Sequence, residues 1–166
     1  MDRNLAIIAL GSNLGNSRQT LQEAIGRIQQ LSAVPVLQSS FWETTPVDCP
    51  PGSPMFLNAV IALVPKSGET PESLLSQLQL LEKEFGRQMK KIANEPRPLD
   101  LDLISFGAEV RDGPALILPH PRAHLRRFVL QPLAEIAPDL HLPGLAGSVS
   151  DLLRELSSDE KIRKVG

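Results

Sequence analysis

The alternation of apolar runs and polar turns along this chain predicts where its strands lie. The nearly continuous apolar runs 4–10 and 56–64 predict two buried strands, and residues 34–41 predict a third strand that continues to Thr44. Apolar and polar residues alternate strictly at the start of 99–106, which is typical of a strand that is buried on one face only.

Helices are predicted where apolar residues recur every three or four positions. This spacing predicts a helix over 18–31 and a second one that begins at Thr70, with proline at its first position, and ends at Gly86. Two later helices are predicted over 128–136, with a bend near its internal proline, and over 151–156.

Glycine and proline mark the connections between these elements. Residues 11–15 (Gly-Ser-Asn-Leu-Gly) predict a tight turn after the first strand, and 109–118 predict a hairpin whose turn contains Asp112-Gly113. The resulting order, β-α-β-β-α-β followed by a hairpin and helices, favours an α+β protein with a ferredoxin-like antiparallel sheet and helices packed on it. The alternative is a parallel α/β sheet, but 34–41 and 56–64 have no helix between them, and a parallel crossover needs one.

The most informative segment is the alternating strand, because it carries two aspartates. Leu99, Leu101 and Leu103 would share one face, and Asp100 and Asp102 the other, with the two carboxylates about 6.5–7 Å apart along the strand. Aspartate is depleted in strands, so two at this spacing call for an explanation. One is a pair of ligands for Mg²⁺ that also binds nucleotide phosphates, and the other is a polar face in contact with water.

Composition bounds the remaining possibilities. The chain has 166 residues and a net charge of −2 with a pI of about 5.9, so we expect a single soluble domain over 1–166 without a field that attracts nucleic acid. Cys49 is the single cysteine and cannot form an internal disulfide. No leader or membrane-spanning run is visible, so we expect a cytoplasmic protein, and a monomer because no apolar stripe is left over.

Basic residues flank the aspartate pair in three groups along the chain. They are Arg87, Lys90 and Lys91, then Arg97, then His120, Arg122 and Arg126. Each one alone is most simply a solvated surface charge. Together, arginines that can bind phosphate and carboxylates that can bind a divalent cation indicate a polyphosphate site.

Several motifs, in order along most of the chain, resemble one enzyme family. They are Gly-Ser-Asn-Leu-Gly at 11–15, Phe-Leu-Asn-Ala at 56–59, Glu82 with Gly86-Arg87, Arg-Pro-Leu-Asp-Leu-Asp-Leu-Ile at 97–104, Leu-Pro-His-Pro-Arg at 118–122 and Phe-Val-Leu-Gln-Pro-Leu at 128–133. This combination resembles 6-hydroxymethyl-7,8-dihydropterin pyrophosphokinase of folate synthesis. The resemblance implies transfer of pyrophosphate from ATP to the hydroxymethyl group of the pterin, with release of AMP.

The resemblance also implies roles for individual residues. Asp100 and Asp102 would hold two Mg²⁺ ions, and Arg87 and Arg97 would act on the phosphates as catalytic residues. The residues expected to bind the pterin are Thr44, Val47, Phe56, Asn58 and Phe128. Those expected to bind ATP are Gln79, Glu82, Arg87, Arg97, Leu103, His120 and Arg126.

Three positions depart from the family's pattern. Thr45 stands where a second proline is frequent, which should matter little if the backbone path is kept. Met89 stands where a second loop arginine is frequent, so we expect Lys90 or Lys91 to supply that charge, without the fork of a guanidinium. No tryptophan lies near Asn94, where some members carry the residue that covers the pterin. The implied partners are therefore the pterin and ATP, with no nucleic acid and no membrane.

Two other function classes would fit parts of this pattern. A ferredoxin-like ligand-binding module would explain the strands and helices but not the aspartates with their surrounding arginines. A metal-dependent nuclease or nucleotidyltransferase could use the same Asp100 and Asp102, yet the near-neutral charge argues against a polynucleotide substrate.

Overall fold

A single antiparallel sheet organises the molecule. The computed structural model describes residues 4–13, 16–44, 55–86, 98–157 and 161–165. Six strands form this sheet in the order β5-β1-β4-β3-β8, with β2 paired to β4 beside β3, and every pairing is antiparallel. The strands are β1 (Ala6–Ser12), β2 (Leu37–Gln38), β3 (Phe41–Thr44), β4 (Phe56–Leu63), β5 (Asp100–Phe106) and β8 (Ile162–Val165).

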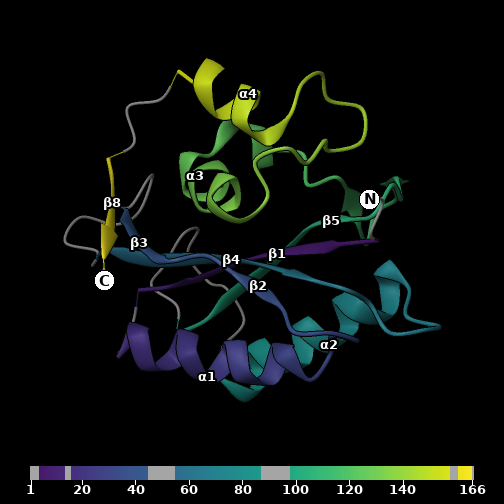
Figure 1. Ribbon diagram of the computed structural model, residues 1–166. Helices are drawn as coiled ribbons and strands as arrows, with labels where there is room; N and C mark the ends of the chain where they lie inside the picture. The colour runs from purple at the N-terminus through teal and green to yellow at the C-terminus, as the bar shows by residue number, and fades with distance from the viewer. Residues whose placement is uncertain (1–3, 14–15, 45–54, 87–97, 158–160, 166) are drawn as a thin grey trace.

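Helices cover both faces of the sheet (Figure 1). Helices α1 (Ser17–Gln29) and α2 (Pro71–Glu84) lie on one face, and α3 (Arg127–Ile136) lies on the other with α4 (Val149–Glu155) packed against it. A short hairpin of β6 (Arg111–Asp112) and β7 (Ile117–Leu118) and a 3₁₀ turn, η1 (Ala123–Leu125), connect β5 to α3.

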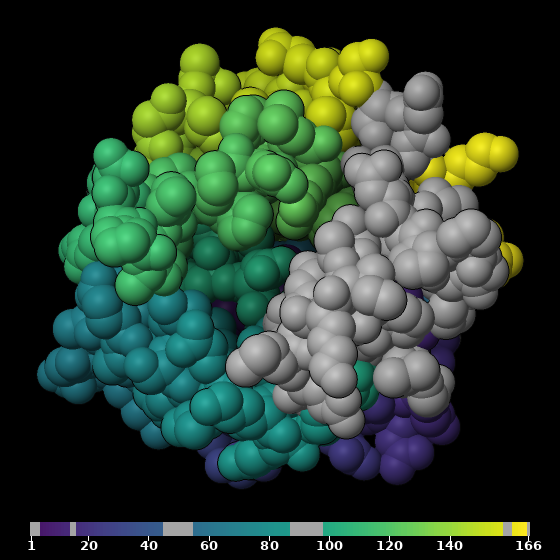
Figure 2. All heavy atoms as spheres, turned by 180° about the vertical axis from the view of Figure 1, so that it is seen from behind, coloured from purple at the N-terminus to yellow at the C-terminus, as the bar shows by residue number. Residues whose placement is uncertain are grey.

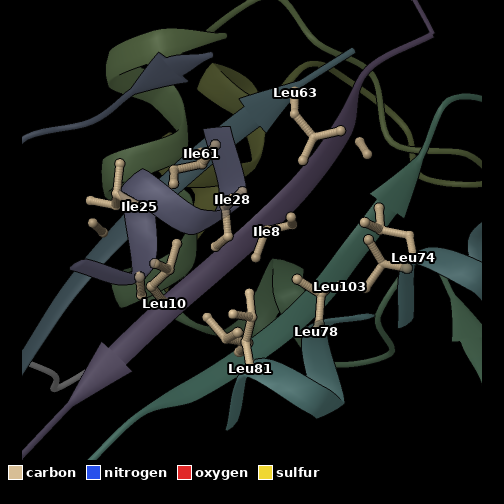
Figure 3. Close-up of a cluster of buried hydrophobic side chains, with 14 of the residues drawn as sticks. Ile8, Leu10, Ile25, Ile28, Ile61, Leu63, Leu74, Leu78, Leu81 and Leu103 are labelled. Carbon is tan, nitrogen blue, oxygen red and sulfur yellow. The ribbon is translucent and has the colours of Figure 1, made fainter. Parts of the chain in front are cut away.

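The larger hydrophobic core lies between the sheet and α1 and α2. Alternate residues of β1, β4 and β5 point to this side because side chains in a strand alternate between its two faces. Figure 3 shows them meeting the apolar stripes of the two helices. Its labelled members are Ile8, Leu10, Ile25, Ile28, Ile61, Leu63, Leu74, Leu78, Leu81 and Leu103.

A second core lies on the opposite face, beneath α3. The intervening residues of the strands build it together with the inward side of α3 and the start of α4. Its buried members are Ile7, Ala9, Val60, Ala62, Ile104, Ala123, Val129, Leu130, Leu133 and Val149. This face matters most for function, because toward one end of β1 its apolar residues give way to polar ones.

Helix capping follows the sequence closely. The Thr70 hydroxyl accepts the Ser73 N–H at 3.1 Å, and the Ser73 hydroxyl accepts the Thr70 N–H at 2.9 Å, so α2 begins with a reciprocal cap. Beyond its end, Gly86 has a φ of 92°, the left-handed conformation that favours glycine after a helix. Ser148 caps α4 in the same reciprocal way with Asp151.

The ferredoxin-like antiparallel fold predicted from the element order is confirmed, and the parallel alternative is wrong. The strand predicted over 34–44 is divided into β2 and β3. Ser39 lies between them, where its hydroxyl accepts the Val60 N–H at 2.9 Å and its own N–H donates to the Val60 carbonyl at 3.0 Å. The side chain thus takes one hydrogen bond that a regular strand would make through its backbone.

Other predictions from the sequence need correction. The hairpin begins at Arg111, two residues later than the predicted start at 109. The Arg111 guanidinium pairs with Glu72 at 2.6 Å and with Glu109 at 2.8 Å. Helix α3 begins at Arg127, one residue before the predicted start, and includes Pro132. The η1 turn and β8 have no periodicity that predicted them.

Candidate functional site

The two aspartates of β5 lie as their alternation predicted. Leu99, Leu101 and Leu103 are buried in the core against α1 and α2. Asp100 and Asp102 are half-buried and point to the opposite face, with Asp100 opposite Gly11 and Asp102 opposite Ala9 in the pairing with β1. At this end of β5 the sheet therefore presents two carboxylates on the face covered by α3.

The pairing of β1 with β4 brings the predicted pterin residues to the same face. Gly11 lies opposite Asn58 on one side and opposite Asp100 on the other, so both side chains flank one position of β1. Asn58 is buried, and its amide Nδ2 donates to the Thr44 hydroxyl at 2.8 Å. Phe56, two residues before Asn58, shares this face and is half-buried.

The segment between β7 and α3 supplies the remaining groups. The His120 N–H donates to the Ile104 carbonyl at 2.8 Å, which holds this segment beside β5. Arg126 is the residue before α3, and its guanidinium lies over the Phe128 ring at 5.4 Å from the centroid. A predicted phosphate ligand and a predicted pterin-stacking ring are thus in contact.

His120 is held in its neutral form. Burial lowers the pKa of His120 below its usual value, the charges of Arg126 and Arg122 lower it further, and the Asp100 carboxylate offsets part of this lowering. Its Nδ1 accepts the Arg122 N–H at 3.2 Å, so the proton of the neutral ring sits on Nε2. The ring is a neutral hydrogen-bond donor near Asp100 rather than a cation.

The predicted ATP residues of α2 and β5 have different surroundings. Glu82 is buried and its Oε2 accepts the Leu101 N–H at 2.8 Å, whereas Gln79, one helical turn earlier, is exposed. The Leu103 side chain lies in the core against α1 and α2, on the face opposite the aspartates. Leu103 can therefore reach a ligand on the aspartate face through its backbone alone.

The view from behind shows a hollow in the surface at this place. In Figure 2 it lies between the green segment that leads into α3 and the teal segment of α2. These two segments, which border the hollow, carry predicted ATP-binding residues.

The site can now be compared with known proteins. The family model described as 7,8-dihydro-6-hydroxymethylpterin-pyrophosphokinase (HPPK) matches residues 7–138. The 2-amino-4-hydroxy-6-hydroxymethyldihydropteridine pyrophosphokinase of Pseudomonas aeruginosa is 39% identical over 137 residues, which cover 82% of each chain. This chain belongs to the HPPK family.

Two further comparisons involve longer HPPK-containing proteins. The folic acid synthesis protein fol1 of Pneumocystis carinii is 37% identical over 157 residues, and the match spans 94% of this chain but only 20% of that protein. A crystal structure of Plasmodium falciparum HPPK-DHPS matches with a TM-score of 0.69 at 12% identity, covering 92% of this chain and 43% of that one. At such low identity the structural match shows the fold alone.

Membership in the HPPK family assigns the reaction. The chain is a pyrophosphokinase that transfers pyrophosphate from ATP to the hydroxymethyl group of 6-hydroxymethyl-7,8-dihydropterin in folate synthesis. The predicted activity is thereby confirmed at this level, and the two rival classes, a binding module and a nuclease, are set aside.

The donor set of this HPPK fits magnesium. Within the described ranges, no group of three or more His, Cys, Asp and Glu side chains is arranged to hold a metal ion. A pair of carboxylates is what Mg²⁺ uses at nucleotide sites, where phosphates and water complete its six ligands. Asp100 and Asp102, half-buried on one face of β5, supply such a pair.

Some predicted HPPK residues cannot be placed. Val47, Arg87 and Arg97 lie outside the described residues. The departures from the family's pattern at Thr45, Met89 and Asn94 also lie outside the described residues, as do Lys90 and Lys91, which are expected to compensate for Met89.

Gly11, which lies between Asn58 and Asp100 in the candidate site, is not among the residues that the sequence predicts for it. Gly11 was assigned to the predicted turn, but β1 continues through Gly11 to Ser12. The apolar run that ends at Leu10 could have indicated this, because a strand can continue through small residues such as Gly11 and Ser12. Elsewhere in the described chain, no helix is long and apolar enough to cross a lipid bilayer.

Proposed function

We propose that the face of the sheet beneath α3 binds both substrates, with the pterin at β4 and the ATP phosphates at β5. The observation that carries this proposal is the register around Gly11, which has Asn58 opposite on one strand and Asp100 opposite on the other. Since adjacent strands lie about 4.8 Å apart, the two side chains start roughly 10 Å from each other. This separation suits a pterin whose hydroxymethyl arm points toward the metal-bound phosphates.

The pterin is recognised by stacking and by one buried amide. Phe56 on β4 and Phe128 on α3 provide rings on either side, and Asn58 hydrogen-bonds the amide-like edge of the heterocycle. Thr44 holds the Asn58 amide through the 2.8 Å hydrogen bond and, with Val47, lines the slot through its backbone. A fixed amide selects a ring of matching donor and acceptor pattern, because any other ring leaves it unpaired.

ATP is bound by groups from α2, from β5, from the segment before α3 and by Arg87 and Arg97. Arg126 and the neutral His120 contact its phosphates from the segment before α3, and Arg87 and Arg97 provide guanidinium forks as catalytic residues. Gln79 and Glu82 on α2 and the backbone of Leu103 contact the nucleoside. The large number of cations suits a substrate with a triphosphate.

Asp100 and Asp102 hold two magnesium ions in this proposal. When bound, these ions neutralise phosphate charge and lower the pKa of a coordinated hydroxyl. The protein's own residues orient the hydroxymethyl oxygen and the phosphates in line for attack, and hold the leaving AMP with Arg126 and His120. No side chain is required as a general base.

At the level of the whole molecule, we propose a single domain over 1–166 that acts as a monomer in the cytoplasm on small molecules rather than nucleic acid. Two cores share one sheet, which supports a single folding unit. The net charge of −2 supports small-molecule substrates over nucleic acid, and the lone Cys49 supports a reducing compartment such as the cytoplasm.

The test is product analysis with charge-neutral variants of the aspartates. Wild type, Asp100→Asn and Asp102→Asn are mixed with ATP, Mg²⁺ and the pterin, and AMP and pterin diphosphate are quantified. We expect equal amounts of both products from wild type, none with EDTA, and a loss of at least about 100-fold in each variant, as when a major electrostatic contact is removed. Asp112→Asn, on the exposed turn side of β6, is the matched control and should retain wild-type rates.

Two outcomes would contradict the proposed roles. Full activity of both aspartate variants would show that the metal ions are held elsewhere. Formation of ADP in place of AMP would show that a single phosphoryl group is transferred and that the assignment of the chemistry is wrong.

A further inference from the structure

Gly11 lies inside a strand, where glycine is costly. Glycine in a strand interior is about 0.5–1 kcal/mol less favourable than alanine because more backbone freedom is lost on folding. The φ of Gly11 is not in the left-handed range that would favour glycine, unlike that of Gly68 or Gly86. The conformation of β1 therefore does not explain the glycine, and the space around it must.

That space belongs to the groups that bind the pterin. A Cβ at Gly11 would lie 3.2 Å from the Asn58 Oδ1 and 3.7 Å from a ring carbon of Phe56. The first contact is tighter than nine in ten real Cβ contacts, so the amide would have to shift by a few tenths of an ångström. Asn58 is 4% exposed and its Nδ2 is bonded to Thr44 at 2.8 Å, so this shift would strain that hydrogen bond and change the position of the amide.

Gly11 also separates the two halves of the site. It is the residue of β1 that lies opposite both Asn58 and Asp100, on the face that carries both side chains. A side chain here would stand between the amide and the carboxylate. In a strand, glycine often marks a place where a ligand approaches the backbone closely.

We propose that Gly11 is a positioning residue that determines pterin affinity. Because Gly11 has no side chain, the Asn58 amide can keep the position in which it hydrogen-bonds the heterocycle. The space above Gly11 is also free for the edge of the pterin ring. This inference rests on the proposed placement of the pterin on this face. ATP is bound from α2, β5 and the segment before α3, so its affinity should not depend on Gly11.

The experiment compares Gly11→Ala with Gly26→Ala. A Cβ at Gly26 on α1 meets nothing within 4 Å, so this matched control adds the same methyl group without a contact. Equilibrium binding of the pterin is measured with and without a non-hydrolysable ATP analogue, together with analogue binding, kcat and KM. For Gly11→Ala we expect at least tenfold weaker pterin binding and a matching rise in the pterin KM, with analogue affinity within twofold of wild type. Gly26→Ala should match wild type in all of these.

A spectroscopic measurement separates positioning from folding. The side-chain NH₂ resonances of Asn58 should shift in Gly11→Ala without ligand, while amide resonances of α1 and α2 stay in place. Unchanged pterin affinity in folded Gly11→Ala would overturn the inference. Equal losses of pterin and analogue affinity, or a variant that does not fold, would also overturn it, by showing that Gly11 serves the sheet rather than the ligand.

Failure of the underlying proposal has a different signature. If the pterin does not bind on this face, Asn58→Ala will leave its affinity unchanged as well. If the pterin does bind there and Gly11 is irrelevant, Asn58→Ala will weaken binding while Gly11→Ala will not.

Discussion

Glu82 is a buried carboxylate that fixes the strand on which the aspartates lie. Its Oε2 accepts the Leu101 N–H at 2.8 Å, and Leu101 lies between Asp100 and Asp102 on β5. Within the described part of the chain β5 is an edge strand, so its outward N–H groups face no described strand, and Glu82 on α2 accepts one of them. The resemblance assigns Glu82 to ATP, and the structure adds this second contact.

Removing the Glu82 carboxylate should destabilise the protein by leaving that N–H buried without its acceptor. We expect Glu82→Ala to lower the free energy of unfolding by about 1–3 kcal/mol. Glu82→Gln keeps an acceptor oxygen at the same distance along the side chain and should lose less than half as much. Urea unfolding of the two variants is the measurement, and equal losses would show that the Leu101 hydrogen bond is not what Glu82 contributes.

At the scale of elements, Glu135 connects α3 to β3 and to Ser40, the residue before β3. Its carboxylate accepts hydrogen bonds from the Ser40 N–H at 2.9 Å, from the Ser40 hydroxyl and from the Trp42 indole at 3.1 Å. Burial alone would raise the pKa of Glu135, but these hydrogen bonds and the nearby Lys164 outweigh it and hold the pKa below its usual value. Trp42 is thereby part of the packing between α3 and β3.

This arrangement predicts a pH dependence of stability. A carboxyl whose pKa is lower in the folded state adds stability that is fully present above its unfolded pKa of about 4.5 and is lost as the pH falls through the folded value. We expect wild type to lose more unfolding free energy than Glu135→Gln between pH about 5 and 3. Urea unfolding across this range is the measurement, and parallel pH profiles for the two proteins would contradict the lowered pKa.

At the scale of the whole molecule, stability depends on the core that α2 forms with the sheet. Leu78 is 1% exposed and packs in this core, whereas Leu80 on the same helix is 58% exposed. Leu78→Ala should therefore cost about 2–5 kcal/mol of unfolding free energy, through lost burial and the cavity left behind. Leu80→Ala should stay within about 0.5 kcal/mol of wild type. Similar losses from both variants would show that α2 does not pack against the sheet as described.

The sequence by itself determined the features that depend on neighbours along the chain. Alternation placed Leu101 and Asp102 on opposite faces, and Thr70 and Gly86 marked the ends of α2, because strand and helix periods and caps are local properties. The antiparallel pairing of β3 with β4 also followed, since a parallel pair needs a crossover, usually a helix, and no helix was predicted between them.

Only the tertiary structure decided which residues face one another. The opposition of Asn58 and Asp100 across Gly11 depends on the register of three strands, and the contact of Glu82 with Leu101 depends on where α2 packs. β8 pairs with β3 across more than a hundred residues. No local pattern encodes such contacts. Bringing distant segments together costs loop-closure entropy, and this cost is offset only by the many other contacts of the folded sheet.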